Sequence, residues 1–171
     1  MHQDDFYKDE ETLFRENVFY DKDLKYHNWE LPACFDGERF RQDFKRLLPK
    51  TDDDDDDENN PPTSSNANFI ILEGILIFED TLISSAMTKR YFLHLPLEEC
   101  RERRSKRNYL PPEPDGYFDK YYWPSYVEQK ARIDGKVEKG DLEMTYLDSE
   151  KENIDELVAR IMDDIKDVIP N

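Results

Sequence analysis

The sequence has few cysteines, few histidines and no long apolar run, and each shortage excludes a class of protein. Cys34 and Cys100 are its two cysteines, and with three scattered histidines they form no zinc-ligand spacing. We therefore expect free thiols and no metal held by soft ligands. The longest apolar stretch, FIILEGILIF, is interrupted by Glu73 and is far shorter than the roughly 20 residues that cross a bilayer.

Basic residues are also scarce, with 24 Lys and Arg against 41 Asp and Glu and a net charge of -17. This balance disfavours binding to a phosphate backbone, so no nucleic-acid partner is expected. The start, MHQDDFYKDE, lacks the basic end and apolar stretch of a signal peptide. We expect a soluble, cytoplasmic protein, with the nucleus as a second location and no membrane partner; the oligomeric state stays open.

What the sequence does contain is enough core-forming material for one domain spanning residues 1–171, since 37% of residues are hydrophobic and 13% aromatic. Residues 49–68, PKTDDDDDDENNPPTSSNAN, are the exception, because adjacent acids repel and cannot build a core. We expect a disordered acidic insertion there; a metal-attracting patch is the alternative.

Hydrophobic periodicity predicts alternating strands and helices. Asp36 is placed to cap a helix that runs to about residue 48, and helices are expected at about 97–107, 119–133 and 152–168. Strands are expected at 69–78, 90–95 and 144–147, the first buried on both faces of a parallel sheet. The pattern indicates an α/β fold with a parallel sheet and helices on both faces. Three strands are few for an open sheet, which usually has about five or six, so the pattern indicates an incomplete sheet.

Acidic residues are the first candidates for chemistry. Asp4 and Asp5 in QDDFYK are adjacent carboxylates that could share base and ligand-binding roles, although alone an acidic chain end is the simpler interpretation. Glu73 stands in an apolar run, where an ionised carboxylate is costly unless a cation or hydrogen bonds compensate it. Magnesium is the natural cation, and a structural ion pair with an arginine is the alternative.

A basic cluster and a set of aromatic residues are the other candidates. Residues 101–107, RERRSKR, place Arg103, Arg104 and Arg107 on neighbouring helix faces, which suits phosphate. A solvated helix neutralised by nearby glutamates explains the cluster equally well. Aromatic side chains that could line a pocket for a flat ring, or form core, are Trp29, Tyr109, Tyr117, Phe118, Tyr121, Tyr122 and Trp123; Trp29 and Tyr109 stand out because each adjoins a charged segment.

Taken together, QDDFYK, HNWELPACFDGERF, FIILEGILIF, ECRERRSKRNYLPPEPDGYFD and EMTYLD resemble the nicotinamide riboside kinase family, P-loop nucleoside kinases near uridine kinase. The resemblance covers residues 1–48 and 69 to about 168. It implies a P-loop nucleoside kinase fold with ATP as phosphate donor and Mg²⁺ as cofactor. The family reaction transfers the γ-phosphate of ATP to the 5′-hydroxyl of nicotinamide riboside, giving the mononucleotide used for NAD synthesis.

The resemblance also implies a role for each matching residue. Asp4 would be the general base, and Glu73 would lie near the metal. Arg103 and Arg107 would bind phosphates. The implied substrate-binding residues are Asp5, Tyr7, Trp29, Glu30 and Arg104, with Glu30 standing where the family pattern suggests Asp.

One departure is large. The family places a strand, a glycine-rich phosphate loop and a helix before QDD, which here begins at residue 3. Only Gly135 and Gly140 have the spacing of G-x-x-x-x-G-K-[ST], and Asp141 and Leu142 follow them. We therefore expect an N-terminally truncated chain with impaired transfer and exposed apolar edges beside the missing strand. The alternatives are a non-catalytic nucleoside- or protein-binding remnant and a kinase for uridine or another nucleoside.

Overall fold

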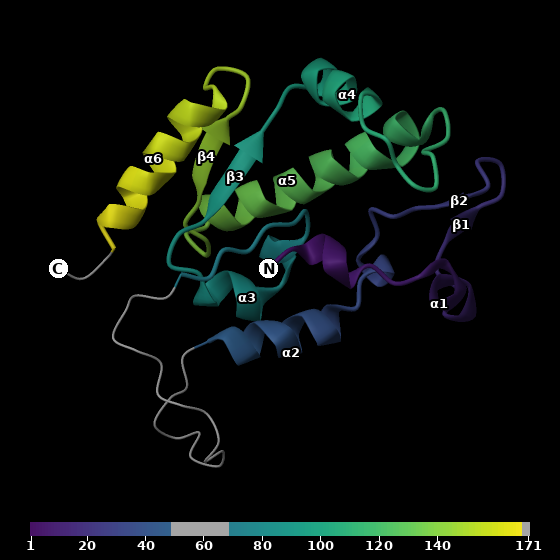
Figure 1. Ribbon diagram of the computed structural model, residues 1–171, viewed down its shortest axis with the longest axis horizontal. Coiled ribbons are helices and arrows are strands. Elements are labelled where there is room, and N and C mark those ends of the chain that lie inside the picture. Colours follow the sequence, from purple (N-terminus) through teal and green to yellow (C-terminus); the bar gives the residue numbers. More distant parts are fainter. Residues whose placement is uncertain (49–68, 169–171) are drawn as a thin grey trace, which may run out of the picture.

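A computed structural model describes residues 1–48 and 69–168 (Figure 1). The acidic insertion expected at 49–68 lies outside the described residues. The helices within them are α1 (Glu10–Arg15), α2 (Gly37–Leu47), α3 (Thr81–Ala86), α4 (Leu97–Ser105), α5 (Trp123–Glu138) and α6 (Ile154–Lys166). The strands are β1 (Tyr20–Asp21), β2 (Tyr26–His27), β3 (Tyr91–His94) and β4 (Thr145–Asp148). Short 3₁₀ segments lie at η1 (Gln3–Phe6), η2 (Pro32–Cys34) and η3 (Ile77–Glu79), and a π-helix lies at Phe118–Tyr122.

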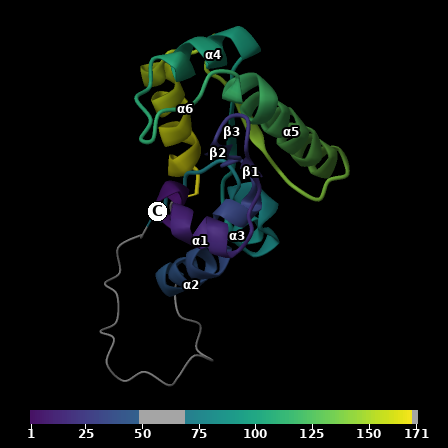
Figure 2. The same ribbon diagram turned by 90° about the vertical axis from the view of Figure 1, so that its right-hand side faces the viewer.

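A small parallel sheet confirms the α/β expectation. β3 pairs with β4 in parallel, with Tyr91 opposite Thr145 and His94 opposite Asp148. Because successive side chains point to opposite faces, Phe92 packs against Ile133 of α5 while the Tyr91 hydroxyl donates to Asp164 of α6. The sheet therefore lies between α5 and α6, as Figures 1 and 2 show.

The prediction of a strand at residues 69–78 is wrong. Met1–Gln3 runs parallel to this segment, joined by one bridge between His2 and Glu73, and the chain then turns into η3. Ile71 is 74% exposed and the Glu73 side chain 55% exposed, so neither is buried on two faces. A strand buried on both faces needs neighbours along both edges, whereas among the described residues only Met1–Gln3 pairs with this segment. Likewise Leu93 of β3, which pairs with β4 alone in the described ranges, is 59% exposed.

One core cluster forms around α2, a helix that the sequence predicted. The Asp36 carboxylate accepts the Arg39 N–H at 3.0 Å and caps α2, whose Phe40 and Phe44 are buried. This helix packs on a cluster that includes Phe6, Phe35, Ile77 and Ile83. Phe78 packs against both this cluster and the one around Phe92, so it joins α2 to the β3–β4 sheet.

The sequence predicted neither the helices α1 and α3 nor the β1–β2 hairpin. β1 and β2 form an antiparallel hairpin, and Asp21 organises its turn by accepting the N–H groups of Asp23 and Leu24. The Asp21 carboxylate also pairs with Lys120 and accepts the Tyr121 hydroxyl at 2.6 Å, which ties the hairpin to the π-helix. These bonds, the one from Lys120 foremost, hold the pKa of Asp21 well below its ordinary value.

The helix expected at 119–133 is two joined elements. α5 begins only at Trp123, so Pro124 lies in its first turn, a position that tolerates proline. The preceding turn is the π-helix, in which the Trp123 N–H bonds the Phe118 carbonyl. Within residues 1–48 and 69–168, no helix has both the length and the apolar character needed to cross a bilayer.

Candidate functional site

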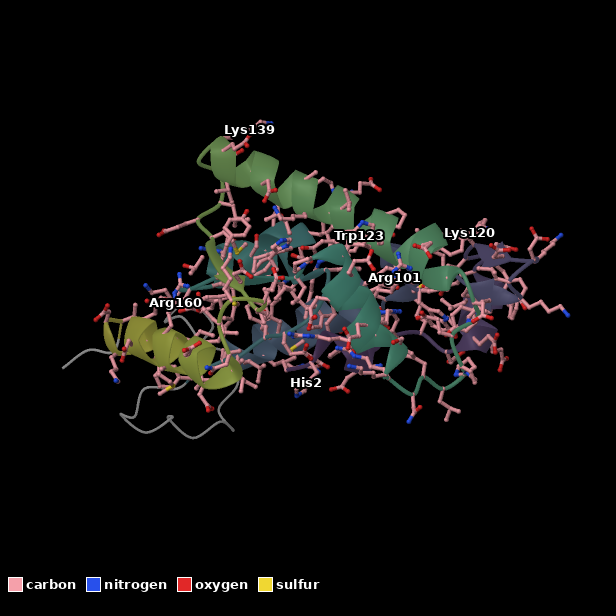
Figure 3. All side chains as sticks on the ribbon, turned by 90° about the horizontal axis from the view of Figure 1, so that it is seen from above. His2, Arg101, Lys120, Trp123, Lys139 and Arg160 are labelled. Atoms are coloured by element: carbon pink, nitrogen blue, oxygen red, sulfur yellow. The ribbon has the colours of Figure 1, made fainter. Side chains whose placement is uncertain are left out.

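Some of the predicted site residues, Glu30 and Arg104 foremost, lie where the segment after β2, α4 and the π-helix meet. Arg101 of α4 faces the π-helix (Figure 3), where its two Nη atoms donate to Asp119 at 2.8 Å each. This bidentate pair joins α4 to the start of the aromatic segment. The hairpin joins the same segment through Asp21, so three parts of the chain are fixed around one corner of the molecule.

Glu30 lies at the centre of this corner. Its side chain is 9% exposed, and its Oε1 accepts the Tyr117 hydroxyl at 3.2 Å and lies 3.6 Å from Arg104 Nη2. The same hydroxyl accepts the backbone N–H of Trp29 at 2.9 Å. Burial raises the pKa of Glu30, and the Arg104 charge and the Tyr117 hydroxyl oppose that rise. A buried carboxylate whose pKa is shifted against specific charge partners is typical of a functional site.

Arg104 is enclosed by rings and acids. Its guanidinium lies 3.8 Å from the Tyr122 ring centroid, 4.8 Å from Tyr109 and 5.9 Å from Tyr117. Its Nε donates to Glu113 Oε2 at 2.9 Å. Tyr117 and Tyr122 are five residues apart, which in an α-helix of 3.6 residues per turn places side chains on different sides. The wider π-helical turn, with its i to i+5 bonding, brings both rings to the same arginine.

Aromatic rings form one wall beside Glu30. Tyr7 lies 4.0 Å from Phe35 and 5.8 Å from Trp29 between ring centroids, the latter pair nearly perpendicular. Burial raises the pKa of the Tyr7 hydroxyl, and the negative charges of Glu30 and Asp4 raise it further. Tyr7 therefore lies within charge range of Glu30 and Asp4; its place beside the substrate stays a prediction.

Asp4 and Glu73 form an acidic pair at the other side. Burial raises the pKa of Asp4, the Glu73 charge raises it further, and Arg107 opposes the rise. Glu73 pairs with His2 at 2.7 Å. Gly74 lets this segment approach η1, because a Cβ there would lie 2.3 Å from the Cβ of Gln3. In the described part of the chain no group of three or more His, Cys, Asp or Glu could hold a metal.

The remaining predicted residues make fewer contacts with this corner. The Asp5 carbonyl accepts from Arg39 at 2.9 Å, while its side chain is exposed. Arg107 is exposed and donates to the Tyr109 hydroxyl at 3.4 Å. Arg103 pairs with Glu99 at 2.6 Å and donates to the Ser149 carbonyl at 3.2 Å, at the end of β4 and not beside Glu30. Its role on phosphate stays a prediction.

A cavity of about 430 Å³ adjoins the corner. Of the predicted site residues, Glu30 alone lines it, together with residues of α5 such as Gln129 and Arg132. Asp4, Glu73 and Arg104 do not line it. Asp4 and Arg104 each act by charge on Glu30, and Glu73 acts by charge on Asp4, but none of the three lines this cavity.

Sequence reasoning missed two residues that hold the site together. Tyr117 was one of several aromatic residues interpreted as pocket lining or core and was not singled out, yet its hydroxyl joins Trp29 to Glu30. Glu113 carried one available signal, an acid between two prolines directly after the basic helix. Its contact with Arg104 depends on the path of the proline-rich loop, which composition does not specify.

Fold and site define an α/β protein with a corner of carboxylates, aromatic rings and arginines, suited to a small polar ligand that carries a ring. No protein-family model matches the chain. Over its whole length the chain is 31% identical to nicotinamide riboside kinase 2 of Homo sapiens, of which it covers 70%, and 29% identical to that of Mus musculus, of which it covers 83%. It is also 35% identical to nicotinamide riboside kinase 1 of Rattus norvegicus, over 57% of this chain and 47% of that protein. The chain belongs to the nicotinamide riboside kinase family.

Proposed function

We propose that this protein binds nicotinamide riboside at the Glu30 corner, for transfer of the ATP γ-phosphate to the ribose 5′-hydroxyl. One observation carries the proposal: the Glu30 carboxylate is buried beside Arg104, next to the rings of Trp29 and Tyr7. The names of the relatives agree, since each is a nicotinamide riboside kinase.

The charge of the corner favours this nucleoside over uridine. Nicotinamide riboside carries a positive pyridinium ring, which aromatic faces attract and neighbouring carboxylates stabilise. Glu30 and Asp4 supply that negative charge, and Trp29 and Tyr7 supply the faces. Glu30 can accept ribose hydroxyls while Arg104 donates to them, so sugar and ring would be held at one place. Uridine has the same ribose hydroxyls, but its ring is neutral and gains no charge stabilisation from the carboxylates.

Asp4 is proposed as the general base that accepts the proton of the 5′-hydroxyl. Its raised pKa suits this role, because a base is most effective when its pKa lies nearer the working pH. Glu73, whose negative charge acts on Asp4, would hold Mg²⁺, which when bound neutralises phosphate charge and usually takes one or two carboxylates with waters and phosphates. Arg107, within charge range of Asp4, is proposed to bind phosphate. Arg103 would have to leave Glu99 to do the same.

The 171-residue chain by itself is proposed to transfer phosphate slowly. Its sequence contains no G-x-x-x-x-G-K-[ST] segment, whose amides and lysine cradle the β- and γ-phosphates in this class of kinase. Phosphoryl transfer depends on the positioning of the ATP phosphates, whereas binding of the nucleoside does not. The chain is therefore expected to bind the nucleoside but to transfer phosphate slowly. In the extreme case, the chain would bind the nucleoside and show no turnover.

Two measurements test these proposals. Calorimetry should show that nicotinamide riboside binds more tightly than uridine and that Glu30→Gln weakens binding about tenfold, the effect of losing a hydrogen bond to a charged group. The matched control is Glu102→Gln, which removes an exposed partner of Lys106 on α4 and should leave affinity unchanged. Equal affinity for both nucleosides would refute the assignment of substrate. In a coupled kinase assay, turnover equal to that of a full-length relative would refute slow transfer.

A further inference from the structure

We propose that Glu113 is a positioning residue for Arg104, holding its guanidinium in the orientation that leaves both Arg104 and Glu30 able to contact a ligand. The inference deepens the proposed function and rests on it for the identity of the ligand. Nothing in the sequence pattern or the family resemblance assigned a role to Glu113.

The contact between Arg104 and Glu113 involves two nitrogen atoms of the guanidinium. Arg104 Nε and Nη2 both donate to Glu113 Oε2, at 2.9 and 2.5 Å, and Nε also approaches Oε1 at 3.3 Å. Two bonds from one planar group fix its plane as well as its position. Guanidinium has five N–H donors, so the contact with Glu113 leaves three for other partners, the two of Nη1 and the second of Nη2. Among the described residues, no hydrogen bond from Arg104 Nη1 is present.

The surroundings limit any other arrangement of Arg104. Tyr122 and Tyr109 approach the guanidinium at 3.8 and 4.8 Å, and the arginine and Glu113 side chains are only 14% and 17% exposed. The loop that carries Glu113 is also held. Prolines on both sides restrict its backbone, and the Pro111 carbonyl accepts the Tyr26 hydroxyl of the hairpin at 3.4 Å.

The balance of charges around Arg104 explains why the position of its guanidinium matters. Arg104 is one positive charge between two carboxylates, Glu113 at hydrogen-bond distance and Glu30 at 3.6 Å. Without Glu113, Arg104 would gain most by forming a close ion pair with Glu30, since a half-buried arginine seeks a carboxylate partner. Such a pair would occupy the oxygens and N–H groups that ribose hydroxyls would use. Glu113 therefore keeps the Arg104–Glu30 distance long enough for a ligand to bind both.

The test uses Glu113→Gln, which keeps the shape of the side chain and removes its charge, with Glu102→Gln as the matched control on α4. In the ligand-free protein, nuclear magnetic resonance of the Arg104 Nε–H group should show a protected, dispersed signal for wild type and the control. We expect this signal to lose its protection in Glu113→Gln. Calorimetry with nicotinamide riboside should show affinity reduced about tenfold in Glu113→Gln, the scale of one charge-assisted hydrogen bond, and unchanged in Glu102→Gln.

Each outcome decides something. An unchanged Nε signal in Glu113→Gln overturns the proposal, and so does a lower melting temperature with unchanged affinity, which would make Glu113 merely structural. Should Glu113→Gln not fold, Glu113→Asp replaces it; retention of the charge at a shorter reach should give a smaller loss of affinity, and equal affinity to wild type would overturn the proposal. Failure of wild type to bind nicotinamide riboside would refute the proposed function instead, while the ligand-free signal would still decide whether Glu113 orders Arg104.

Discussion

Replacing Tyr117 by phenylalanine removes one oxygen atom from the middle of the site. Tyr117 is 1% exposed, and its hydroxyl accepts the Trp29 N–H at 2.9 Å while donating to Glu30 at 3.2 Å. The variant keeps the ring and its packing, so the loss is confined to these two bonds. Leaving one buried donor without this partner costs about 1–3 kcal/mol.

That cost converts to a measurable shift in melting. For a chain of 150–250 residues, 1 kcal/mol lowers the melting temperature by about 2–4 °C, so Tyr117→Phe should melt about 2–12 °C below wild type. The variant should also bind nicotinamide riboside more weakly, by about fivefold for each kcal/mol lost in the complex. Part of that loss comes from Glu30, whose pKa rises further once the hydroxyl no longer stabilises its ionised form.

Scanning calorimetry and ligand titration check both numbers, with Tyr91→Phe as the control. The Tyr91 hydroxyl also donates to an acid, Asp164, but at 3.1 Å between β3 and α6, away from Glu30. This control should melt within a few degrees of wild type, because a partly exposed bond contributes about 0.5–1.5 kcal/mol, and should keep full affinity. If Tyr117→Phe matches wild type in both measurements, the hydroxyl does not organise Trp29 and Glu30, and the reasoning fails.

Three further outcomes are expected. Because burial raises the pKa of Glu30, affinity for nicotinamide riboside should increase as pH rises through that pKa, and titrations of Glu30→Gln should lose this part of the pH dependence; an identical profile would contradict the role of Glu30. Leu147→Ala, at a fully buried position of β4, should lower the free energy of unfolding by about 2–5 kcal/mol in urea, whereas a loss below 1 kcal/mol would mean that the sheet is not tightly packed there. Leu93→Lys, on the exposed part of β3, should change stability by less than about 0.5 kcal/mol and reduce light scattering at high protein concentration; unchanged scattering would exclude this edge as a site of self-association.

Local signals were sufficient for most helices. Asn153 and Glu156 form a capping box at the start of α6, and Asp36 caps α2, so both starts could be predicted from residue types at short spacing. The strand at β3 was also predictable, because a short apolar run ends at Pro96. These predictions succeeded because each depends on residues that lie close together in the sequence.

Predictions that depended on distant pairing failed or were not made. Residues 69–78 have the composition of a buried strand, but strand formation requires partners that the run itself does not specify. The β1–β2 hairpin has no Asn-Gly or Asp-Gly turn to reveal it; instead Asp21 bonds the turn amides and Lys120, which is 99 positions away. The π-helix was not predicted from local spacing either; Tyr122 within it and Tyr117 directly before it both have their rings near Arg104.

For the site, the sequence by itself determined the family, through motifs that place Asp4, Glu30 and Arg104 in recognisable order, and it determined the absence of a G-x-x-x-x-G-K-[ST] segment within these 171 residues. Only the tertiary structure decided that Tyr117 and Glu113 hold Glu30 and Arg104 in place, and that Arg103 faces β4. The physical reason is that residue type specifies which hydrogen bonds and charges a side chain can offer. Which partner accepts them depends on how segments far apart in the chain pack together.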